Sequence, residues 1–392
     1  MPASPDHQDI TSKLAELAAG AGLRRVSMLA WRDLDDPEAG GSEVHAAEVA
    51  RHWAEAGIEV TMRTSFAAGR PVVAWRDGYR VIRKAGRYLV FPRAAFSEMM
   101  GWHGGRDGLV EIWNGMPFFS PLWARTPHIT VVHHLHAEMW EMTLPPNLAR
   151  LGRFIEFRVA PPMYRNTQIV TPSESSREEL IRELHLRPER VTTVHNGVDA
   201  RFFADDTPKS PTPLVIAVGR LVPVKRYHAL LDVLAKVKPH YPELRAVIVG
   251  DGYERDDLRA QIKELRAERW IELTGYVRDE VVVDLYRRAW VVASASAREG
   301  WDLSITEAAA CGTPAVASRV TGHLDTVVDG RTGLLADSDD ELATKLARVL
   351  GDDALRDDLR RGALAHASQF TWGATALGIL EVLADAARCH RR

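Results

Sequence analysis

Short apolar runs alternate with amphipathic stretches along almost the whole chain. A short apolar run bounded by turn residues is typical of a buried strand, and apolar residues three or four positions apart are typical of a helix that covers a sheet. The alternation therefore predicts strand–helix units around parallel sheets, an α/β fold. In the first half we expect strands at 26–30, 58–64, 109–113, 129–133, 168–171 and 191–195, and helices at 43–56, 147–158 and 175–184.

A stretch rich in Pro, Asp and Ser, without periodicity, interrupts this pattern at 199–213 and predicts a linker. The pattern then restarts, with strands expected at 214–218, 246–249, 271–274, 291–294 and 315–317, and helices at 227–238, 256–267, 280–289 and 305–311. We therefore expect two Rossmann-like, doubly wound domains, residues 1–198 and 214–370. The last segment, 371–392, carries a long helix that could cross back onto the first domain.

Composition and charge narrow the class of protein. The chain has 46% hydrophobic and 26% charged residues and a net charge of −3, as in an ordinary globular protein without the basic face of a nucleic-acid binder. Cys311 and Cys389 cannot form a disulfide framework and fit a reducing cytosol. The charged N-terminus does not suit a secretory signal, and no apolar run approaches the roughly 18 residues of a membrane span. We expect a cytoplasmic protein with no nucleic-acid partner.

The densest polar signal is the segment from Glu299 to Pro314, which follows a predicted strand. Gly300 permits a tight backbone path, and Ser304 can cap the helix expected next. The amides of about 303–306 would then lack partners inside the helix and could bind a phosphate. Alternatively, Ser304 and Glu307 form a plain capping box. That alternative leaves Glu299, Gly300 and the run that ends at Pro314 unexplained.

A second polar segment, Gly219-Arg220-Leu-Val-Pro-Val-Lys225-Arg226, follows the first predicted strand of the second domain. Arg220 and Lys225 would lie where a doubly wound sheet binds its ligand, and together they could hold a diphosphate. A pair of basic residues in a loop is also common on solvated surfaces. The position beside a predicted phosphate-binding helix favours the diphosphate.

Taken together, these residues resemble the family-four retaining glycosyltransferases, also called group one, which have the GT-B fold of two Rossmann-like domains facing a central cleft. The likeness runs from about Val26 to Gly333. It is carried by Glu299 and Glu307 in a Glu-x7-Glu pattern, by Gly219, Arg220 and Lys225, by Asn196-Gly-Val-Asp199, and by Gly40-Gly41-Ser-Glu43.

The resemblance implies an N-terminal domain that binds the acceptor and a C-terminal domain that binds a nucleotide-sugar donor. Glu307 would hold the ribose hydroxyls, Glu299 would contact the donor sugar near its 3-hydroxyl, and Arg220 and Lys225 would neutralise the diphosphate. The amides of Gly40 and Gly41 would approach the distal phosphate, and the base would lie near Gly250-Asp-Gly252 and Tyr276-Val277. Further donor contacts would come from Asn196, Gly219, Gly250, Val277, Gly300, Trp301, Asp302, Leu303 and Ser304. The resemblance implies no cofactor and no metal ion.

Asp302 departs from the family pattern, which usually reads Glu-Gly-Phe/Trp-Gly at 299–302. A carboxylate beside a diphosphate is unfavourable unless it points away or hydrogen-bonds a sugar hydroxyl. The departure leaves the donor sugar open, and with it the level of activity.

His133 ends a predicted strand in Val131-Val-His133-His134-Leu-His136 and resembles the histidine of the family's catalytic cleft. It would orient the donor sugar or the acceptor hydroxyl. A core or solvated histidine is the simpler alternative, and a zinc site lacks a third ligand placed by spacing. Asp33-Leu-Asp35 matches a metal-binding Asp-x-Asp pattern, but we interpret it as loop chemistry because the remaining motifs favour GT-B.

The segment 76–93 carries six basic residues. We expect a solvated hairpin around Ala85-Gly86, and contact with an anionic surface at the inner face of the membrane remains the alternative.

We therefore expect transfer of a hexosyl group from a UDP- or GDP-sugar to an acceptor hydroxyl, on a lipid, a saccharide or a small molecule, with retention of configuration. A sugar-nucleotide epimerase or a phosphorylase on the same scaffold is the competing enzyme class, although no pyridoxal-binding lysine motif is evident. A nucleotide-sugar-binding protein without turnover is the third alternative, motivated by Asp302.

Overall fold

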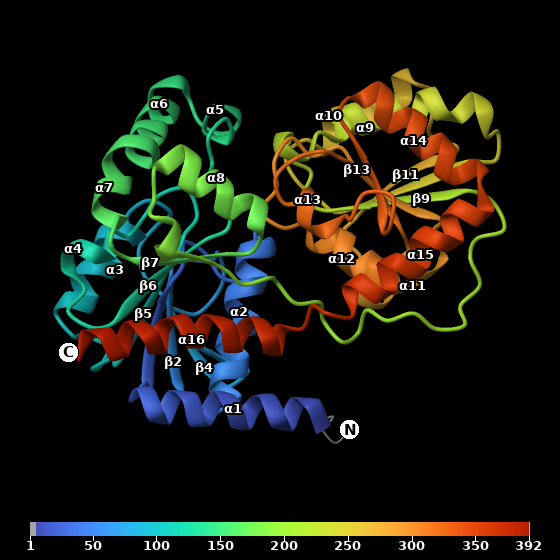
Figure 1. Ribbon diagram of the computed structural model, residues 1–392. Helices are drawn as coiled ribbons and strands as arrows, with labels where there is room; N and C mark the ends of the chain where they lie inside the picture. Colours follow the sequence, from blue (N-terminus) through green and yellow to red (C-terminus); the bar gives the residue numbers. More distant parts are fainter. Residues whose placement is uncertain (1–4, 392) are drawn as a thin grey trace. The chain divides into compact units, whose positions relative to one another are not determined.

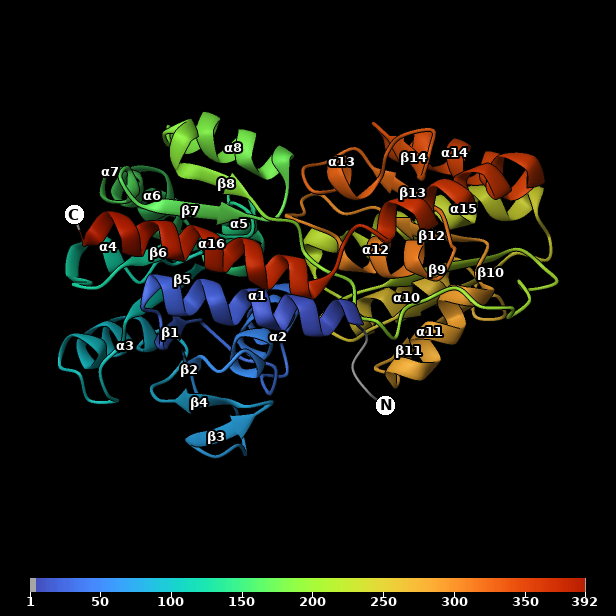
Figure 2. The same ribbon diagram turned by 60° about the horizontal axis from the view of Figure 1, so that its bottom comes forward.

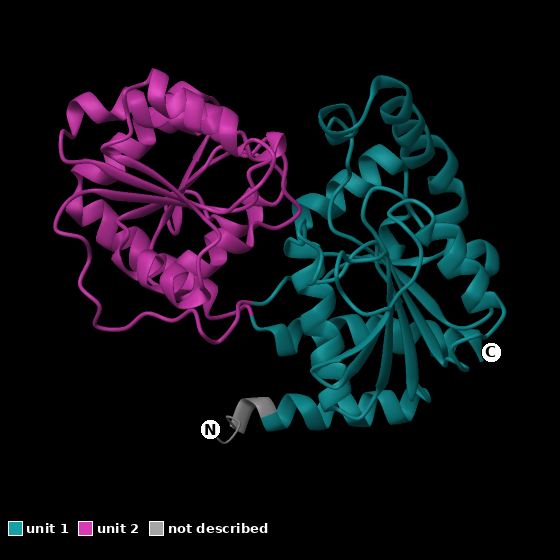
Figure 3. Cartoon of the chain, turned by 180° about the vertical axis from the view of Figure 1, so that it is seen from behind, with its two compact units in different colours: residues 1–197, 371–392 teal, residues 198–370 magenta. Residues whose placement is uncertain are grey.

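The computed structural model describes residues 5–391 as two compact units. Unit 1 comprises Met1–Gly197 and Thr371–Arg392, and unit 2 comprises Val198–Phe370 (Figure 3). Each unit is built on one largely parallel sheet with helices packed around it (Figure 1). The predicted α/β class is confirmed. The predicted linker, 199–213, belongs to unit 2, and the C-terminal segment belongs to unit 1.

Unit 1 holds an eight-stranded sheet in the order β3-β4-β2-β1-β5-β6-β7-β8, in which only the β3–β4 pair is antiparallel. Its strands are β1 (Arg25–Leu29), β2 (Glu59–Thr64), β3 (Val73–Arg76), β4 (Tyr79–Arg83), β5 (Gly108–Trp113), β6 (His128–Val132), β7 (Gln168–Thr171) and β8 (Val191–Thr193). Its helices are α1 (Pro5–Ala21), α2 (Gly41–Glu55), α3 (Val90–Met99), α4 (Ser120–Trp123), α5 (Met139–Thr143), α6 (Pro146–Phe154), α7 (Ala160–Tyr164), α8 (Glu174–Leu184) and α16 (Trp372–His390), with a π-helical segment at Ile155–Val159 and a 3-10 turn at Pro188–Arg190.

The C-terminal helix α16 completes the core of unit 1, although more than 170 residues of unit 2 separate it from the rest of that unit. It packs against α1 and α2, and Leu383 is fully buried (Figure 2). The indole of Trp53 on α2 donates a hydrogen bond of 2.9 Å to the Ala376 carbonyl. A side chain at Gly197 would meet the Trp372 backbone nitrogen at 2.1 Å, so only glycine allows the two segments to pass this closely.

The hairpin that we expected around Ala85-Gly86 lies elsewhere. Strands β3 and β4 are joined at Asp77 and Gly78, whose φ angles are 44° and 83°. Asp-Gly is the dipeptide that a two-residue hairpin turn with positive φ favours, and it is the signal that the basic pattern concealed. Ala85-Gly86 instead leads from the sheet into α3.

Unit 2 holds a six-stranded, all-parallel sheet in the order β11-β10-β9-β12-β13-β14. Its strands are β9 (Leu214–Val218), β10 (Arg245–Val249), β11 (Ile271–Gly275), β12 (Val291–Ser294), β13 (Ala315–Ser318) and β14 (Gly333–Ala336). Its helices are α9 (Tyr227–Val237), α10 (Arg255–Glu264), α11 (Asp279–Arg288), α12 (Leu303–Ala310), α13 (His323–Thr326), α14 (Asp339–Gly351) and α15 (Asp353–Ala367), with 3-10 turns at Pro223–Lys225 and Lys238–His240.

The strand order places a switch point in each sheet. In unit 2 the chain runs outward from β9 through β10 to β11, and then returns to β12 on the other side of β9. In unit 1, β1 lies in the same way between β2 and β5. Ligands of open parallel sheets bind outside the carboxyl ends of the strands at such points. The loops that follow β9 and β12, and those that follow β1 and β5, are therefore the places to look for a site.

Candidate functional site

Lys225, Glu299 and Asp302 form an ionic cluster beside the switch point of unit 2, in which Asp302 is buried and the other two are half-buried. Lys225 ends the turn after β9, and the two carboxylates follow β12. The Lys225 ammonium lies 2.7 Å from Glu299 Oε1 and 3.6 Å from Asp302 Oδ2. Burial opposes the charge of Lys225, but the two carboxylates outweigh it and raise the pKa of this lysine above its ordinary value. The structure thus joins two motifs that lie more than 70 residues apart.

Asp302, rather than Ser304, caps α12. One carboxylate oxygen, Oδ1, accepts hydrogen bonds from the Ser304 amide at 3.1 Å and from its hydroxyl at 2.6 Å. The prediction that Ser304 caps the helix is wrong, and so is the capping-box alternative, because the helix begins at Leu303. Asp and Ser are equally good caps and stand two residues apart, so local sequence does not choose between them. The Ser304 amide, which we expected to be available for phosphate, is already bound.

His323 is the partner that explains the buried Asp302 side chain. It begins α13 and is fully buried; its Nε2 lies 3.2 Å from Asp302 Oδ2, and its Nδ1 lies 2.7 Å from the Ser318 carbonyl. Burial raises the pKa of Asp302, but Lys225 and the hydrogen bond from His323 reverse this and hold that pKa well below its ordinary value. No sequence motif indicated His323. The Asp302 carboxylate is therefore paired within the protein, with Lys225, Ser304 and His323.

Within residues 5–391, Glu299, Asp302 and His323 form the one group of three ligand-type side chains whose oxygen and nitrogen atoms lie close enough together to hold a metal ion. The Lys225 ammonium already lies against the carboxylates of Glu299 and Asp302. In this arrangement lysine supplies the positive charge.

Glu307 lies one turn into α12, and its Oε2 accepts a hydrogen bond of 3.2 Å from the hydroxyl of Tyr286 on α11. Burial raises the pKa of Glu307 to about 8, and the nearby carboxylate of Asp302 adds to the increase. The side chain is therefore largely protonated at neutral pH and can both donate and accept hydrogen bonds.

Two glycines bring the neighbouring loops together. A side chain on Gly250, whose φ is 137°, would meet the Gly219 carbonyl oxygen at 1.9 Å. The Gly219 amide donates a 3.0 Å hydrogen bond to the Val249 carbonyl. The loops after β9 and β10 thus run edge to edge beside the ionic cluster. Val277, half-buried, and the exposed Tyr276 follow β11, the next strand outward.

The other predicted donor-binding residues of unit 2 differ in how accessible they are. Arg220 is half-buried in the loop after β9. Gly300 is buried, and the Leu303 side chain is partly accessible. The Trp301 ring is buried edge-on against Phe370 at 4.9 Å between ring centroids, so this indole anchors the loop to the core of unit 2.

In unit 1, Gly40 and Gly41 start α2 at the end of the loop that follows β1. The Gly40 amide donates a 2.8 Å hydrogen bond to Glu43, which also pairs with the buried Arg32 at 3.3 Å. From the loop after β5, Asn114 donates a 3.0 Å hydrogen bond to the Ser42 hydroxyl. Both loops of the switch point therefore hold the helix start, where backbone amides lack partners within the helix.

His133 follows β6 and lies with its ring 4.6 Å, centroid to centroid, from that of His45 on α2. Both are buried, and neither ring nitrogen of His133 has a hydrogen-bond partner in the part of the chain that the structure describes. Burial lowers the pKa of His133 to about 4 and also lowers that of His45, so both rings are neutral at pH 7. His45 escaped the sequence analysis, although it lies on the buried face of α2 four residues after Gly41.

Asn196 is another buried polar side chain of unit 1, and its Oδ1 has no hydrogen-bond partner within residues 5–391. Buried polar atoms are usually satisfied, so unsatisfied ones indicate groups that await a ligand or water. His133, His45 and Asn196 meet this description.

The loop that follows His133 is held by Glu156, a buried residue that sequence reasoning missed. Its two oxygens accept hydrogen bonds from the His136 amide at 2.7 Å and the Ala137 amide at 3.0 Å. The indole of Trp140 donates a further bond of 2.9 Å.

Asp33 and Asp35 are engaged by arginines. Arg83 Nε donates to Asp33 at 3.0 Å, and Arg76 pairs with Asp35 at 2.8 Å. These contacts support the interpretation of Asp33-Leu-Asp35 as loop chemistry.

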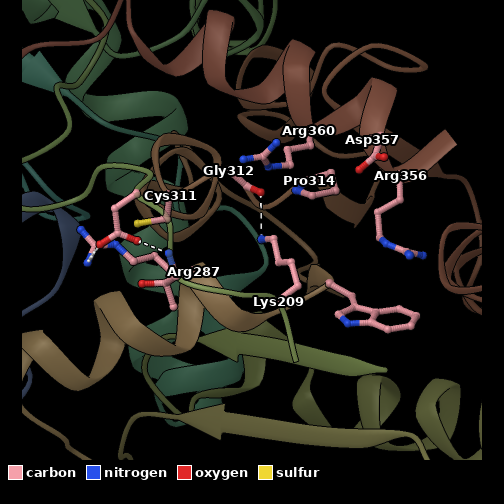
Figure 4. A pocket seen from close by; sticks show the side chains of 11 residues that line it. Lys209, Arg287, Cys311, Gly312, Pro314, Arg356, Asp357 and Arg360 are labelled. Carbon is pink, nitrogen blue, oxygen red and sulfur yellow. Dashed lines mark hydrogen bonds and ion pairs between the residues drawn. The ribbon is translucent and has the colours of Figure 1, made fainter. Parts of the chain in front are cut away.

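A separate pocket in unit 2 contains none of the predicted site residues (Figure 4). Lys209 enters it and donates to the carbonyls of Ala289 and Gly312, each at 2.9 Å, and to the Thr313 hydroxyl at 2.7 Å. Arg287 pairs there with Asp205 at 2.6 Å. Because Lys209 and Arg287 already bind protein oxygens, these contacts hold the 199–213 segment against the rest of unit 2.

Comparison with known proteins gives the family context. The model of glycosyl transferases group 1 matches residues 199–366, and that of glycosyltransferase family 4 matches residues 39–202. The D-inositol 3-phosphate glycosyltransferase of Streptomyces scabiei is 31% identical, with 94% of this chain and 93% of the relative covered. That of a Nocardioides species is 30% identical, with 92% and 89% covered.

Solved structures agree on the fold. Sucrose-phosphate synthase from Thermosynechococcus elongatus superposes with a TM-score of 0.78 at 20% identity, covering 91% of this chain and 97% of that one. Anabaena HepE, solved in complex with UDP and glucose, superposes with a TM-score of 0.71 at 20% identity, covering 92% and 100%. The predicted GT-B class is confirmed. In residues 5–391, no helix has the length and apolar character needed to cross a membrane.

Proposed function

Because the chain belongs to the group 1, family 4 glycosyltransferases, we propose that it transfers a hexosyl group from a nucleotide-diphosphate sugar to an acceptor hydroxyl with retention of configuration. The observation that carries the proposal is the Lys225–Glu299 pair of 2.7 Å beside the switch point of unit 2. It combines a cation for the diphosphate with a carboxylate for sugar hydroxyls. The epimerase alternative has no support among the relatives described above.

The reaction breaks the bond between the anomeric carbon and the leaving phosphate oxygen. Negative charge grows on that oxygen, so preorganised positive groups there supply most of the acceleration. Lys225 and Arg220 fill this role, and Glu307 takes the ribose hydroxyls. The acceptor oxygen attacks from the same face, and the leaving phosphate accepts its proton.

Lys225 is already charged and already held by two carboxylates. A diphosphate therefore meets a fixed ammonium that needs no reorganisation. With this cation at the carboxylates, we propose that transfer requires neither a metal ion nor a cofactor. Added chelator should leave the rate unchanged, and a rate restored by Mg²⁺ or Mn²⁺ would contradict this.

For the acceptor we propose the buried His133 and His45 of unit 1. With pKa values lowered by burial, both imidazoles are neutral and offer a nitrogen lone pair to a hydroxyl hydrogen. D-inositol 3-phosphate, named in the relatives, is the first acceptor to test, and UDP-sugars are the first donors because of the HepE complex. We propose a cytoplasmic location, because Cys311 and Cys389 are free cysteines, as is usual in a reducing compartment.

The proposed function is tested by incubating the protein with UDP- and GDP-sugars and the acceptor, and by determining the anomeric configuration of the product by NMR. We expect a glycoside with the configuration of the donor. A glycoside of inverted configuration would overturn retention. Release of nucleoside diphosphate without any glycoside, across saccharide, lipid and small-molecule acceptors, would overturn transfer.

A further inference from the structure

Helix α3 and the residues that flank it expose an unusual number of large apolar side chains. Phe96 and Trp102 are 51% and 58% exposed, and their rings contact each other edge to face at 5.4 Å between centroids. The opposite side of α3, with Val90 and Ala94, is buried in the core of unit 1. We call the exposed set the α3 surface; it consists of Tyr88, Leu89, Phe96, Met99, Met100 and Trp102.

This surface is not an ordinary outer face of a helix. A helix that packs one side on a core normally presents charged and polar residues on the other. Here the exposed side of α3 carries Phe96 and Met99 beside a single charged residue, Arg93, and α3 lies at the outside of unit 1 (Figure 2). Contiguous exposed apolar side chains of this kind mark contact with a partner or a membrane.

Three cations lie around His103, next to Trp102 of the α3 surface: Arg80, Lys84 and Arg93. The pKa of His103 is lowered to about 4 by burial and by the charges of Arg63, Lys84, Arg80 and Arg93. Arg63 is neutralised by the buried Glu98 at 3.0 Å. Within the described residues, Arg80, Lys84 and Arg93 form no ion pair or hydrogen bond with another side chain.

We propose that the α3 surface binds the headgroup region of an anionic lipid bilayer. Phosphate headgroups complement the unpaired cations, and the aromatic and methionine side chains enter the boundary with the acyl chains. A second copy of the chain is a poorer occupant, because pairing two such surfaces would bring six unpaired cations together. The contact is peripheral and does not depend on the proposed glycosyl transfer.

The test is sedimentation of the full chain with vesicles of phosphatidylcholine alone and with vesicles that contain phosphatidylglycerol. We expect binding only to the anionic vesicles, weakened by added salt. Each cation near an anionic surface contributes about 1 kcal/mol, or about fivefold in affinity, so the double variant Arg80→Gln, Arg93→Gln should bind roughly 25-fold more weakly. Phe96→Ser with Trp102→Ser should also lose binding.

Matched controls come from exposed positions of unit 2. Val281→Ser and Arg269→Gln remove an exposed apolar group and an exposed charge elsewhere, and should bind as the native chain does. Circular dichroism and nucleotide-induced thermal stabilisation check that each variant is folded. Equal binding to both kinds of vesicle, or none, would overturn the proposal. So would a native dimer that Phe96→Ser dissociates, because the occupant would then be a second copy.

Discussion

At the scale of single residues, Lys225 is the side chain on which the proposed catalysis depends most. Lys225→Ala removes the positive charge that stabilises the leaving diphosphate, so we expect kcat to fall by about two to three orders of magnitude, as for loss of one oxyanion donor. Nucleotide binding should weaken less. Steady-state kinetics and calorimetry with UDP separate the two effects. Near-native turnover of the variant would show that Lys225 does not stabilise the leaving diphosphate.

Asp302 is the second residue whose role can be isolated. Asp302→Asn keeps a side chain that can cap α12 but removes the charge that faces Lys225 and His323. Breaking a buried ion pair typically costs about 3–5 kcal/mol, and we expect the free energy of unfolding of unit 2 to fall by roughly that amount. Urea denaturation measures it. A loss below about 0.5 kcal/mol, the usual range for surface changes, would mean that the cluster is not held as described.

Asp302→Gly restores the residue usual in the family. It tests the alternative that the native chain binds a nucleotide sugar without transferring it. If the native chain transfers sugar, Asp302 is compatible with catalysis. If only the glycine variant does, the native chain is a binding protein.

Glu307 makes stability depend on pH. Its folded pKa of about 8 lies above the ordinary value of 4.5, so the folded state holds this proton more tightly. The resulting stability is fully present below about pH 4.5 and is lost as the pH rises through 8. Glu307→Gln should therefore flatten the decline in the free energy of unfolding between about pH 5 and 8, and equal slopes for both proteins would contradict the assignment.

At the scale of elements, α16 shows how a distant segment stabilises unit 1. Leu383 is fully buried against the sheet, so Leu383→Ala should cost about 2–5 kcal/mol through lost contacts and a cavity. Glu381→Ala, exposed on the same helix, is the control and should change little. Chemical denaturation followed by tryptophan fluorescence compares them. Similar midpoints for both variants would mean that α16 is not part of the core.

Element positions were largely readable from the sequence. Strands β7, β9 and β12 begin and end at the predicted residues, because short apolar runs between turn residues leave little choice of boundary. The predicted hairpin was placed around Ala85-Gly86 instead of at the β3–β4 turn, because the Asp77-Gly78 turn was not recognised. Strand β14 and helices α14 and α15 follow the last motif and were not predicted.

At the scale of the whole molecule, the strand order of each sheet decides which loops meet. Residues 219–225 and 299–302 come together because β12 returns to lie beside β9, which a linear pattern does not state. The same return brings β5 beside β1 and lets Asn114 reach Ser42.

The sequence by itself determined the α/β class and the family, and it predicted two domains and the site residues Glu299, Glu307, Lys225 and His133, because these rest on local periodicity and on motifs that resemble those of the family. Only the tertiary structure decided that Asp302 caps α12 and pairs with His323, and that His45 faces His133. Such contacts join residues far apart in the chain, and their formation depends on strand order and on competition among nearby polar groups for the same partners.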